Sequence, residues 1–123
     1  MGVDRKTYLR QPSIPRPSGK RLIDSVERFI DEHISEEITV ERLCEEFDVS
    51  RTKLYETVRP YTNGGIAAYI KHKRLEHAKN LLKTTDMTIP QISDASGFSD
   101  YNYFLRLFKQ KYGISTKQMR KED

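Results

Sequence analysis

Two stretches of the chain, residues 39–63 and 88–113, repeat the same order of capping, apolar and turn-forming residues. The aligned pairs are Thr39 with Thr88, Leu43 with Ile92, Ser50 with Ser99, Leu54 with Phe104, Val58 with Phe108 and Asn63 with Gly113. Each copy has the pattern of a short helix, a tight turn and a second helix, which is the helix-turn-helix arrangement. Two copies in register seldom arise by chance, so the repeat predicts two helix-turn-helix subdomains.

The residues around and between the repeats are also spaced as in helices. From Arg21 onward apolar positions recur three and four residues apart, and no window alternates as a strand would. Before the first repeat the apolar face is Leu22, Val26, Phe29, Ile30 and Ile34, and between the repeats it is Ile66, Tyr69, Ile70, Leu75, Ala78, Leu81 and Leu82. We therefore predict an all-α fold of about seven helices, in which a long central helix, residues 66–83, joins the two subdomains.

Short polar residues and glycines predict where the helices begin and end. We expect Thr39, Ser50 and Ser115 as N-caps, and either Ser99 or Asp100 before the second helix of the second repeat. The second helices should end at Asn63-Gly64-Gly65 and at Gly113, since Asn and Gly tolerate the left-handed backbone. The expected buried faces of these second helices are Leu54, Val58 and Tyr61 in the first repeat and Tyr103, Phe104, Leu107 and Phe108 in the second.

Charge is distributed unevenly along the chain. Residues 22–48 carry ten acids against two basic residues, whereas residues 49–121 carry fourteen basic residues against five acids. Such an asymmetry suggests that one side meets a polyanion, although solvated helix faces without a partner explain charge alone equally well. Residues 1–20 are basic, contain three prolines and lack periodicity, so we predict a disordered basic tail or linker there and a folded domain at 21–123.

Several classes of protein are disfavoured. No apolar run reaches the roughly eighteen residues of a membrane span, so we expect no membrane contact by this segment. Cys44 is the only cysteine, which excludes an internal disulfide and favours the cytoplasm. His33, His72 and His77 are scattered and no nucleophile accompanies them, so we predict no enzyme activity, no metal site and no cofactor.

The predicted central helix and the second repeat resemble the AraC/XylS family of bacterial transcription regulators. The matching motifs are RLEHAKNLL at 74–82, IPQI at 89–92, GFSDYNYF at 97–104, RLFK at 106–109 and GIS at 113–115, within a resemblance that covers residues 22–121. The first repeat looks most like members fused to two-component sensors. The resemblance implies a DNA-binding domain, and the linker-like composition of residues 1–20 suggests that an effector or dimerisation domain is missing from this chain. Glu56, at a position where several relatives have Arg, is a departure that puts its base contact in doubt.

The central helix suggests how two such subdomains would act on DNA. Eighteen residues make a rod of about 27 Å, which with the helix widths holds the second helices about one turn of DNA apart, about 34 Å. We therefore predict sequence-specific binding of double-stranded DNA, with the two second helices in successive major grooves, to regulate bacterial transcription. The alternative is a helical protein-interaction module whose acidic first helices dock RNA polymerase or a sensor domain.

The buried faces of the second helices leave other side chains exposed to meet DNA. For base contacts we predict Thr52, Tyr55, Glu56, Tyr101, Asn102, Leu105 and Arg106, with Asn102 suited to adenine and Arg106 to guanine. For phosphate contacts we predict Ser50, Arg51, Lys53, Arg59, Ser99 and Lys109, the two serines marking helix N-termini with free amides. Arg106 has two alternatives, as a brace of the fold or as a phosphate contact alone, and Tyr103 is expected in the core, with a phosphate contact as its alternative. Lys71, Lys73, Arg74 and Lys79 on the central helix are expected to be solvated charges, with a structural alternative for Arg74.

Overall fold

The computed structural model describes the chain from Gly19 to Glu122, and its side chains from Leu22 onward. Residues 1–18 of the predicted tail lie outside the described residues. The helices are α2 (Gly19–Glu32), α3 (Val40–Phe47), α4 (Arg51–Val58), α5 (Gly65–Thr84), α6 (Ile89–Ala95), α7 (Tyr101–Tyr112) and α8 (Thr116–Lys121), with a 3₁₀ turn, η1 (Arg59–Tyr61), after α4. The described part of the chain contains no strand, and the prediction of an all-α fold is confirmed.

The helix N-termini are capped by short polar side chains, as the sequence predicts. Thr39, Ser50 and Ser115 each accept a hydrogen bond from the amide three residues later. Thr88 forms a complete capping box with Gln91 before α6. Of the two candidates before α7, Asp100 is the cap, because its Oδ1 accepts from the Tyr103 amide at 3.0 Å.

The end of α4 differs from the prediction. The regular helix stops at Val58 and gives way to η1, because Pro60 has no amide to donate and its ring opposes a continuing helix. The Asn63-Gly64-Gly65 segment therefore does not close α4. Gly64 is instead the N-cap of α5, and Gly65, at φ +78°, is its first residue. Tyr61, expected on the buried face, is 58% exposed.

The first helix also extends further back than predicted. Helix α2 begins at Gly19, two residues before the predicted boundary of the folded domain. It ends at Glu32, so Ile34 lies in the turn beyond it, although Ile34 is buried as expected. Ile23 joins Val26 and Ile30 in the core, and the pattern read from the sequence left it out.

The described residues form two hydrophobic cores, and α5 contributes to both. Its N-terminal part, with Ile66, Tyr69 and Ile70, packs with α2, α3 and α4. Its C-terminal part packs with α6, α7 and α8 in the second core, whose buried members are Leu75, Ala78, Leu82, Ile92, Phe98, Phe104, Phe108 and Met119. Each half therefore contains one helix-turn-helix, α3–α4 in the first half and α6–α7 in the second, held on the same central helix.

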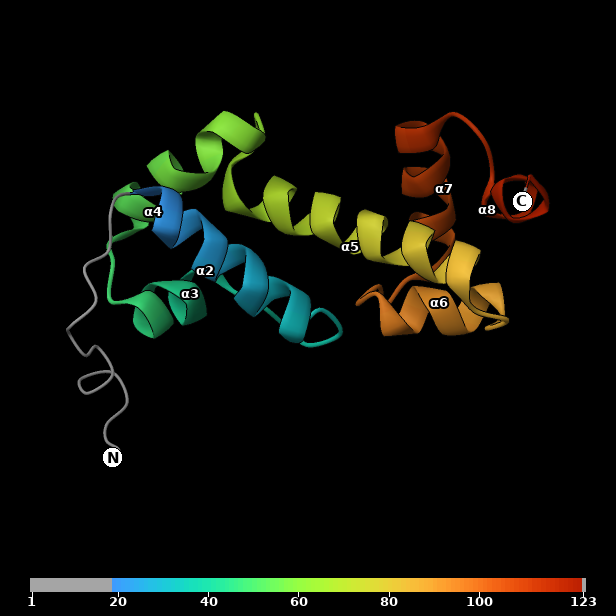
Figure 1. The fold of residues 1–123 in the computed structure, drawn as a ribbon, viewed down its shortest axis with the longest axis horizontal. Coiled ribbons are helices and arrows are strands. Elements are labelled where there is room, and N and C mark those ends of the chain that lie inside the picture. The colour runs from blue at the N-terminus through green and yellow to red at the C-terminus, as the bar shows by residue number, and fades with distance from the viewer. Residues whose placement is uncertain (1–18, 123) are drawn as a thin grey trace.

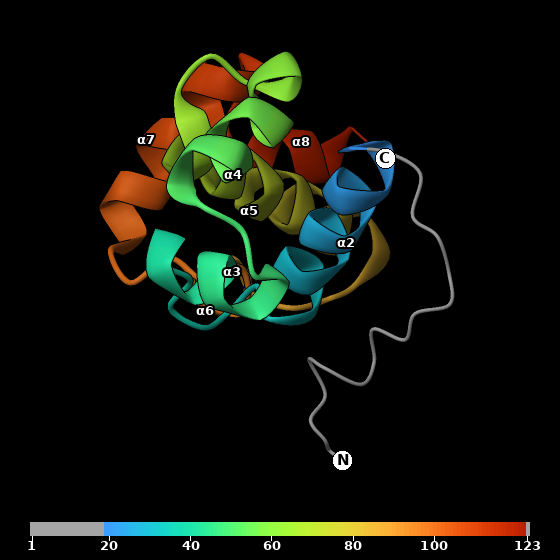
Figure 2. The same ribbon diagram turned by 90° about the vertical axis from the view of Figure 1, so that its left-hand side faces the viewer.

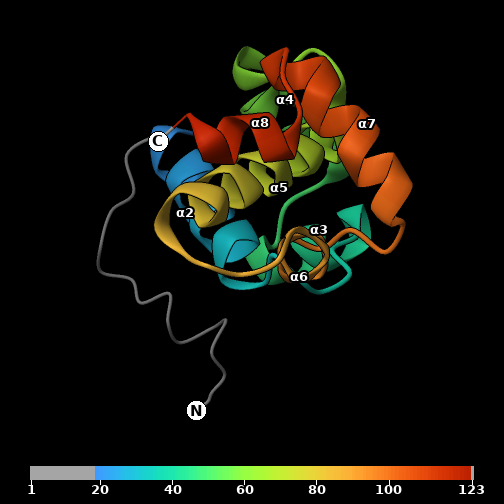
Figure 3. The same cartoon turned by 90° about the vertical axis from the view of Figure 1, so that its right-hand side faces the viewer.

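The second helices of the two motifs lie on one side of the central helix. In Figure 1, α4 and α7 stand above α5, whereas α3 and α6 lie below it. The views along α5 agree, with α4 and α7 in the upper part of Figure 2 and of Figure 3. This shared side is what a domain that binds one face of a duplex requires.

Candidate nucleic-acid interface

Helix α4 presents a polar surface with a fixed orientation. Leu54 and Val58 are buried in the first core, and because helix positions three and four apart share a face, the other positions face outward. The residues exposed there are Ser50, Arg51, Thr52, Lys53, Tyr55, Glu56 and Arg59, which are all the predicted contact residues of this motif. Tyr55 is 46% exposed, and its ring lies about 3.5 Å from the space that a Cβ would occupy at Gly65.

Helix α7 presents the corresponding surface of the second motif. Phe104 and Phe108 are fully buried, which turns Tyr101, Asn102, Arg106 and Lys109 outward. Leu105 differs from the other predicted base contacts, because it is only partly exposed and packs against the second core. Only the outer edge of the Leu105 side chain is therefore accessible for an apolar contact.

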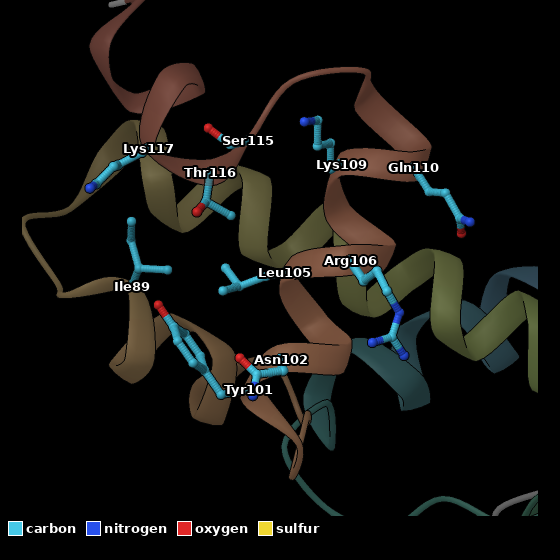
Figure 4. A pocket seen from close by; sticks show the side chains of 10 residues that line it. All are labelled: Ile89, Tyr101, Asn102, Leu105, Arg106, Lys109, Gln110, Ser115, Thr116 and Lys117. Carbon is cyan, nitrogen blue, oxygen red and sulfur yellow. The ribbon is translucent and has the colours of Figure 1, made fainter.

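These α7 side chains border a hollow of about 700 Å³. Its walls come from the first turn of α6, the exposed face of α7 and the first turn of α8. Figure 4 shows Tyr101, Asn102 and Leu105 directed into the space between α7 and the residues of α6 and α8. Arg106 lies at its rim, on the side away from α8. Five lining residues are predicted DNA contacts: Tyr101, Asn102, Leu105, Arg106 and Lys109.

Two of the candidate DNA-contacting arginines already have partners within the chain. Arg51 pairs with Glu41 of α3 through Nη2 and Oε2. Both side chains are largely exposed, so this pair contributes little to stability. The Arg106 guanidinium lies 5.6 Å from the centre of the Tyr103 ring, a cation–π contact one helix turn back. That contact restricts the orientations of the Arg106 side chain. The Tyr103 ring face does not take up the guanidinium N–H groups as a hydrogen-bond acceptor would.

The two helix N-termini differ in their suitability for phosphate. At α4 the Ser50 hydroxyl accepts from Lys53 N at 3.0 Å, so the cap is neutral. Ser99, predicted as a matching helix terminus, lies one residue before the cap of α7. Because the cap itself is the carboxylate of Asp100, negative charge already occupies the positive end of that helix dipole. The geometry therefore favours Ser50 over Ser99 as a phosphate-binding terminus.

Three basic side chains are structural where the sequence suggested solvent or gave no signal. Lys73 is 9% exposed and its Nζ lies 2.6 Å from Glu27 Oε2, with Asp31 and Glu76 also within 4 Å. Burial alone would lower the pKa of Lys73, but the Glu27 hydrogen bond and the three carboxylates raise it above its usual value. The expectation that Lys73 is a solvated charge is therefore wrong.

Arg74 and Arg120 are the other two. Arg74 donates to backbone carbonyls of the α2–α3 loop, which bears out its structural alternative. Arg120 of α8 donates to the carbonyls of Leu82, Thr85 and Met87, and so ties α8 to the α5–α6 connection. Nothing local in the sequence distinguishes Arg120 from the basic residues around it.

Tyr103 is also placed differently from the prediction. The preferred prediction for Tyr103 is a core position, but the side chain is 38% exposed and lies beside Arg106, so that prediction is wrong, and its alternative as a phosphate contact stays a prediction. Phe104 and Phe108 fill the centre of the buried face, flanked by Leu105 and Leu107, and Tyr103 lies outside that arc of the helix. Tyr103 therefore belongs to the exposed surface of α7.

The described residues contain neither a cluster of metal-binding side chains nor a helix that could span a membrane. Between Gly19 and Glu122, no three His, Cys, Asp or Glu side chains are grouped so that they could hold a metal ion. Within the same range, every helix is too short or too polar to cross a membrane.

Comparison with known families gives one match that covers most of the folded region. A family model described as a helix-turn-helix domain matches residues 43–122. Among curated proteins, the chain is 34% identical over 101 residues to the uncharacterized HTH-type transcriptional regulator YijO of Escherichia coli. It is 31% identical over 105 residues to the Msm operon regulatory protein of Streptococcus mutans. These alignments cover 82% and 85% of this chain but only 36% and 38% of the relatives, so the chain spans about a third of their length.

Solved structures show the same fold. The C-terminal domain of the two-component response regulator yesN from Fusobacterium nucleatum is 34% identical, with a TM-score of 0.66, and the match covers 82% of this chain and 96% of that one. The xylose-binding transcription activator xylR is 26% identical, with a TM-score of 0.74, over 92% of this chain and 29% of that one.

Proposed function

The chain belongs to the AraC family of helix-turn-helix transcription regulators, as a DNA-binding domain of that family, and on this premise we propose that it binds double-stranded DNA sequence-specifically through α4 and α7. The two helices would enter successive major grooves on one face of the duplex and so regulate transcription in the bacterial cytoplasm. A central helix of 20 residues, about 30 Å long, has the length that this arrangement needs.

The observation that carries the proposal is that α4 and α7, whose exposed faces are polar, lie on one side of α5 (Figure 1). Each face belongs to the second helix of a helix-turn-helix, and each is oriented by two buried apolar residues. A pair of helices on opposite sides of the rod would be unable to contact one duplex together. The shared side therefore favours a two-site reader over two independent modules.

We assign base contacts to the central part of each exposed face. On α7, the Asn102 amide is suited to the N6 and N7 edge of adenine, and the Arg106 guanidinium to O6 and N7 of guanine. Tyr101 and the outer edge of Leu105 provide apolar or hydroxyl contacts beside them. On α4, Thr52 and Tyr55 occupy the corresponding place, and Glu56 would accept from the cytosine amino group.

Phosphate contacts are assigned to the cationic and capping residues at the edges of these faces. Arg51, Lys53 and Arg59 flank the base-contacting residues of α4, and Lys109 stands one turn after Leu105 on α7. Ser50 adds the N-terminus of α4, and Ser99 is the weaker candidate because of the neighbouring Asp100 carboxylate. These contacts would fix the register of the domain on the duplex without reading its sequence.

A second candidate function is docking of RNA polymerase or a sensor domain on the acidic surface of α2 and α3. Several carboxylates of this acidic surface already form ion pairs with basic side chains of the same chain. Glu27 and Asp31 flank Lys73, and Glu36 pairs with Arg42. This reduces the charge available to a basic partner, so we rank docking below DNA binding, with which it is compatible.

The test is a selection of bound duplexes from a random library, followed by affinity measurements at increasing salt. If α4 and α7 together neutralise several phosphates, log Kd should change with log salt with a slope of about 4 or more. Arg51→Ala and Lys53→Ala should each reduce that slope by about 1. Arg28→Ala, an equal charge change on the exposed face of α2, is the matched control and should leave it unchanged. A salt-independent or undetectable interaction with every duplex would favour the docking function instead.

A further inference from the structure

The middle of α5 is polar, although the helix is buried on both sides of it. Ile66, Tyr69 and Ile70 belong to the first core, and the second core begins at Leu75. The four residues between them are Lys71, His72, Lys73 and Arg74. This polar stretch separates the two hydrophobic cores, so the relative orientation of the two halves depends on α5 and on any contact made beside it.

Arg74 makes such a contact with the first half. Its Nε donates to the carbonyl of Ile34 at 3.2 Å, and its Nη2 donates to the carbonyl of Glu36 at 2.6 Å. Both acceptors lie in the loop between α2 and α3, some forty residues earlier in the chain. Burial lowers the pKa of Arg74, as expected for a guanidinium partly withdrawn from water.

The second half contacts the same α2–α3 loop and Arg74 through Gly97. Gly97 lies in the turn between α6 and α7 at φ +91°, a conformation that side chains rarely adopt. A Cβ at Gly97 would stand 2.3 Å from the Ile34 carbonyl oxygen and 2.6 Å from Arg74 Nε. Figure 1 shows the α2–α3 loop facing the connection between α6 and α7 below the centre of α5. The turn of the second helix-turn-helix is thus in direct contact with the first half.

We infer that Arg74 is a positioning residue for two-site DNA reading, acting through an inter-half contact made of Ile34, Glu36, Arg74 and Gly97. The contact lies beside the axis of α5, so it opposes bending and rotation that the helix alone would permit. It therefore sets the direction of α7 relative to α4, and with it the spacing of the two DNA half-sites that the domain accepts. The inference rests on the proposed function for its DNA consequence and on the fold alone for its geometric one.

Helices α4 and α7 would act on DNA as two linked binding modules. When one helix is bound, the other meets its half-site at an effective concentration that depends on how well the geometry matches. A rigid link gives a large advantage at one spacing and little at others. Loosening the link lowers affinity at the matched spacing and raises the tolerance of mismatched spacings, while each helix still reads its own half-site.

The geometric consequence is tested without DNA, by distances between two spin labels in the full chain. In a Cys44→Ala background, Glu46→Cys on α3 and Asp94→Cys on α6 place labels at exposed positions of the two halves. We expect a narrow distance distribution, which Arg74→Ala broadens and Lys71→Ala leaves narrow. Lys71 is exposed on the same helix, so its variant matches the loss of charge. An equally narrow distribution in Arg74→Ala would overturn the inference even if DNA binding is intact.

The DNA consequence is tested on the selected duplex and on versions with one base pair inserted or deleted between half-sites. The parent protein should prefer the selected spacing, and Arg74→Ala should reduce that preference by about tenfold. Binding to a duplex with only one half-site should change less than twofold. Failure to select any duplex would refute the proposed function and leave the spin-label result standing.

Two further variants distinguish loss of this contact from a general loss of folding. Arg74→Lys keeps the charge but lacks the planar group that reaches two carbonyls at once, so it should fold and should lose part of the spacing preference. Gly97→Ala disturbs the contact from the other half and should shift or broaden the label distances in the same way. If both variants retain the parent distances and spacing preference, Arg74 has only a local structural role.

Discussion

Arg106 carries the most specific chemistry of the exposed residues of α7. Its guanidinium lies over the Tyr103 ring, 5.6 Å from the ring centre, and therefore has a preferred orientation in the free protein. Preorganisation of this kind lowers the entropic cost of a two-pronged contact. The burial of Phe104 and Phe108 sets which side chains of α7, Arg106 among them, face outward.

We predict that Arg106→Ala weakens binding to the selected duplex by about 1–3 kcal/mol and relaxes base preference at one position. The reason is that the N7 and O6 edge of one guanine would lose both of its donors. Affinity for the selected duplex, for duplexes altered at single positions and for random DNA measures the effect. Arg28→Ala on α2 is the control, and equal losses on all duplexes would reassign Arg106 to the phosphate backbone.

At the scale of the helices, the C-terminus of α7 depends on one glycine. Gly113 is in the left-handed region at φ +81° and its amide donates to the Lys109 carbonyl at 2.8 Å. A Cβ there would meet nothing within 4 Å, so the requirement for glycine is in the backbone and not in the surroundings. This helix end directs the chain into the Ser115 cap of α8.

We predict that Gly113→Ala destabilises the protein by about 1 kcal/mol, because alanine pays the steric cost of the left-handed conformation. Gly113→Asn should cost less, since Asn adopts this conformation more readily. Urea unfolding followed by helical circular dichroism gives both values. A loss for Asn as large as that for Ala would indicate that Gly113 is needed for a contact and not for its backbone.

At the scale of the whole molecule, the burial of ionisable groups in both halves makes the folded state less stable at alkaline pH. Burial, followed by the charge of Glu27, raises the pKa of Tyr69 to about 12, and burial raises the pKa of Tyr112 to about 12. In the unfolded chain a tyrosine titrates near 10. The folded state thus favours the neutral phenol, and its advantage is complete below pH 10 and is lost as pH rises from 10 to 12.

We predict that the free energy of unfolding falls by a few kcal/mol, on the order of 2 for Tyr69 alone, between pH 10 and 12. The raised pKa of Lys73 acts in the same direction, because it loses its charge only above the unfolded value. Tyr69→Phe should flatten the pH dependence, with Tyr61→Phe, at an exposed ring, as control. Urea unfolding across this pH range checks the prediction, and an unchanged slope in Tyr69→Phe would contradict it.

Much of the fold was predictable because it depends on residues a few positions apart. The caps at Thr39, Ser50 and Ser115 follow from hydrogen bonds to amides three residues on, and the buried pair Phe104 and Phe108 follows from helical spacing. The same local reasoning oriented α4 and α7, so the exposure of most candidate contact residues was foreseen. The predicted C-terminal end of α4 is wrong, because Pro60 ends the helix before the Asn-Gly-Gly segment is reached.

By itself, then, the sequence determined the helices, their order as two repeated motifs and the outward faces of the second helices, since nearest neighbours along the chain control these features. Only the tertiary structure decided that Lys73 is buried against α2, that Arg74 reaches the carbonyls of Ile34 and Glu36, and that α4 and α7 share one side of α5. These contacts join residues 38 to 46 positions apart. Their partners are set by how two cores pack on one rod, and no local pattern records that packing.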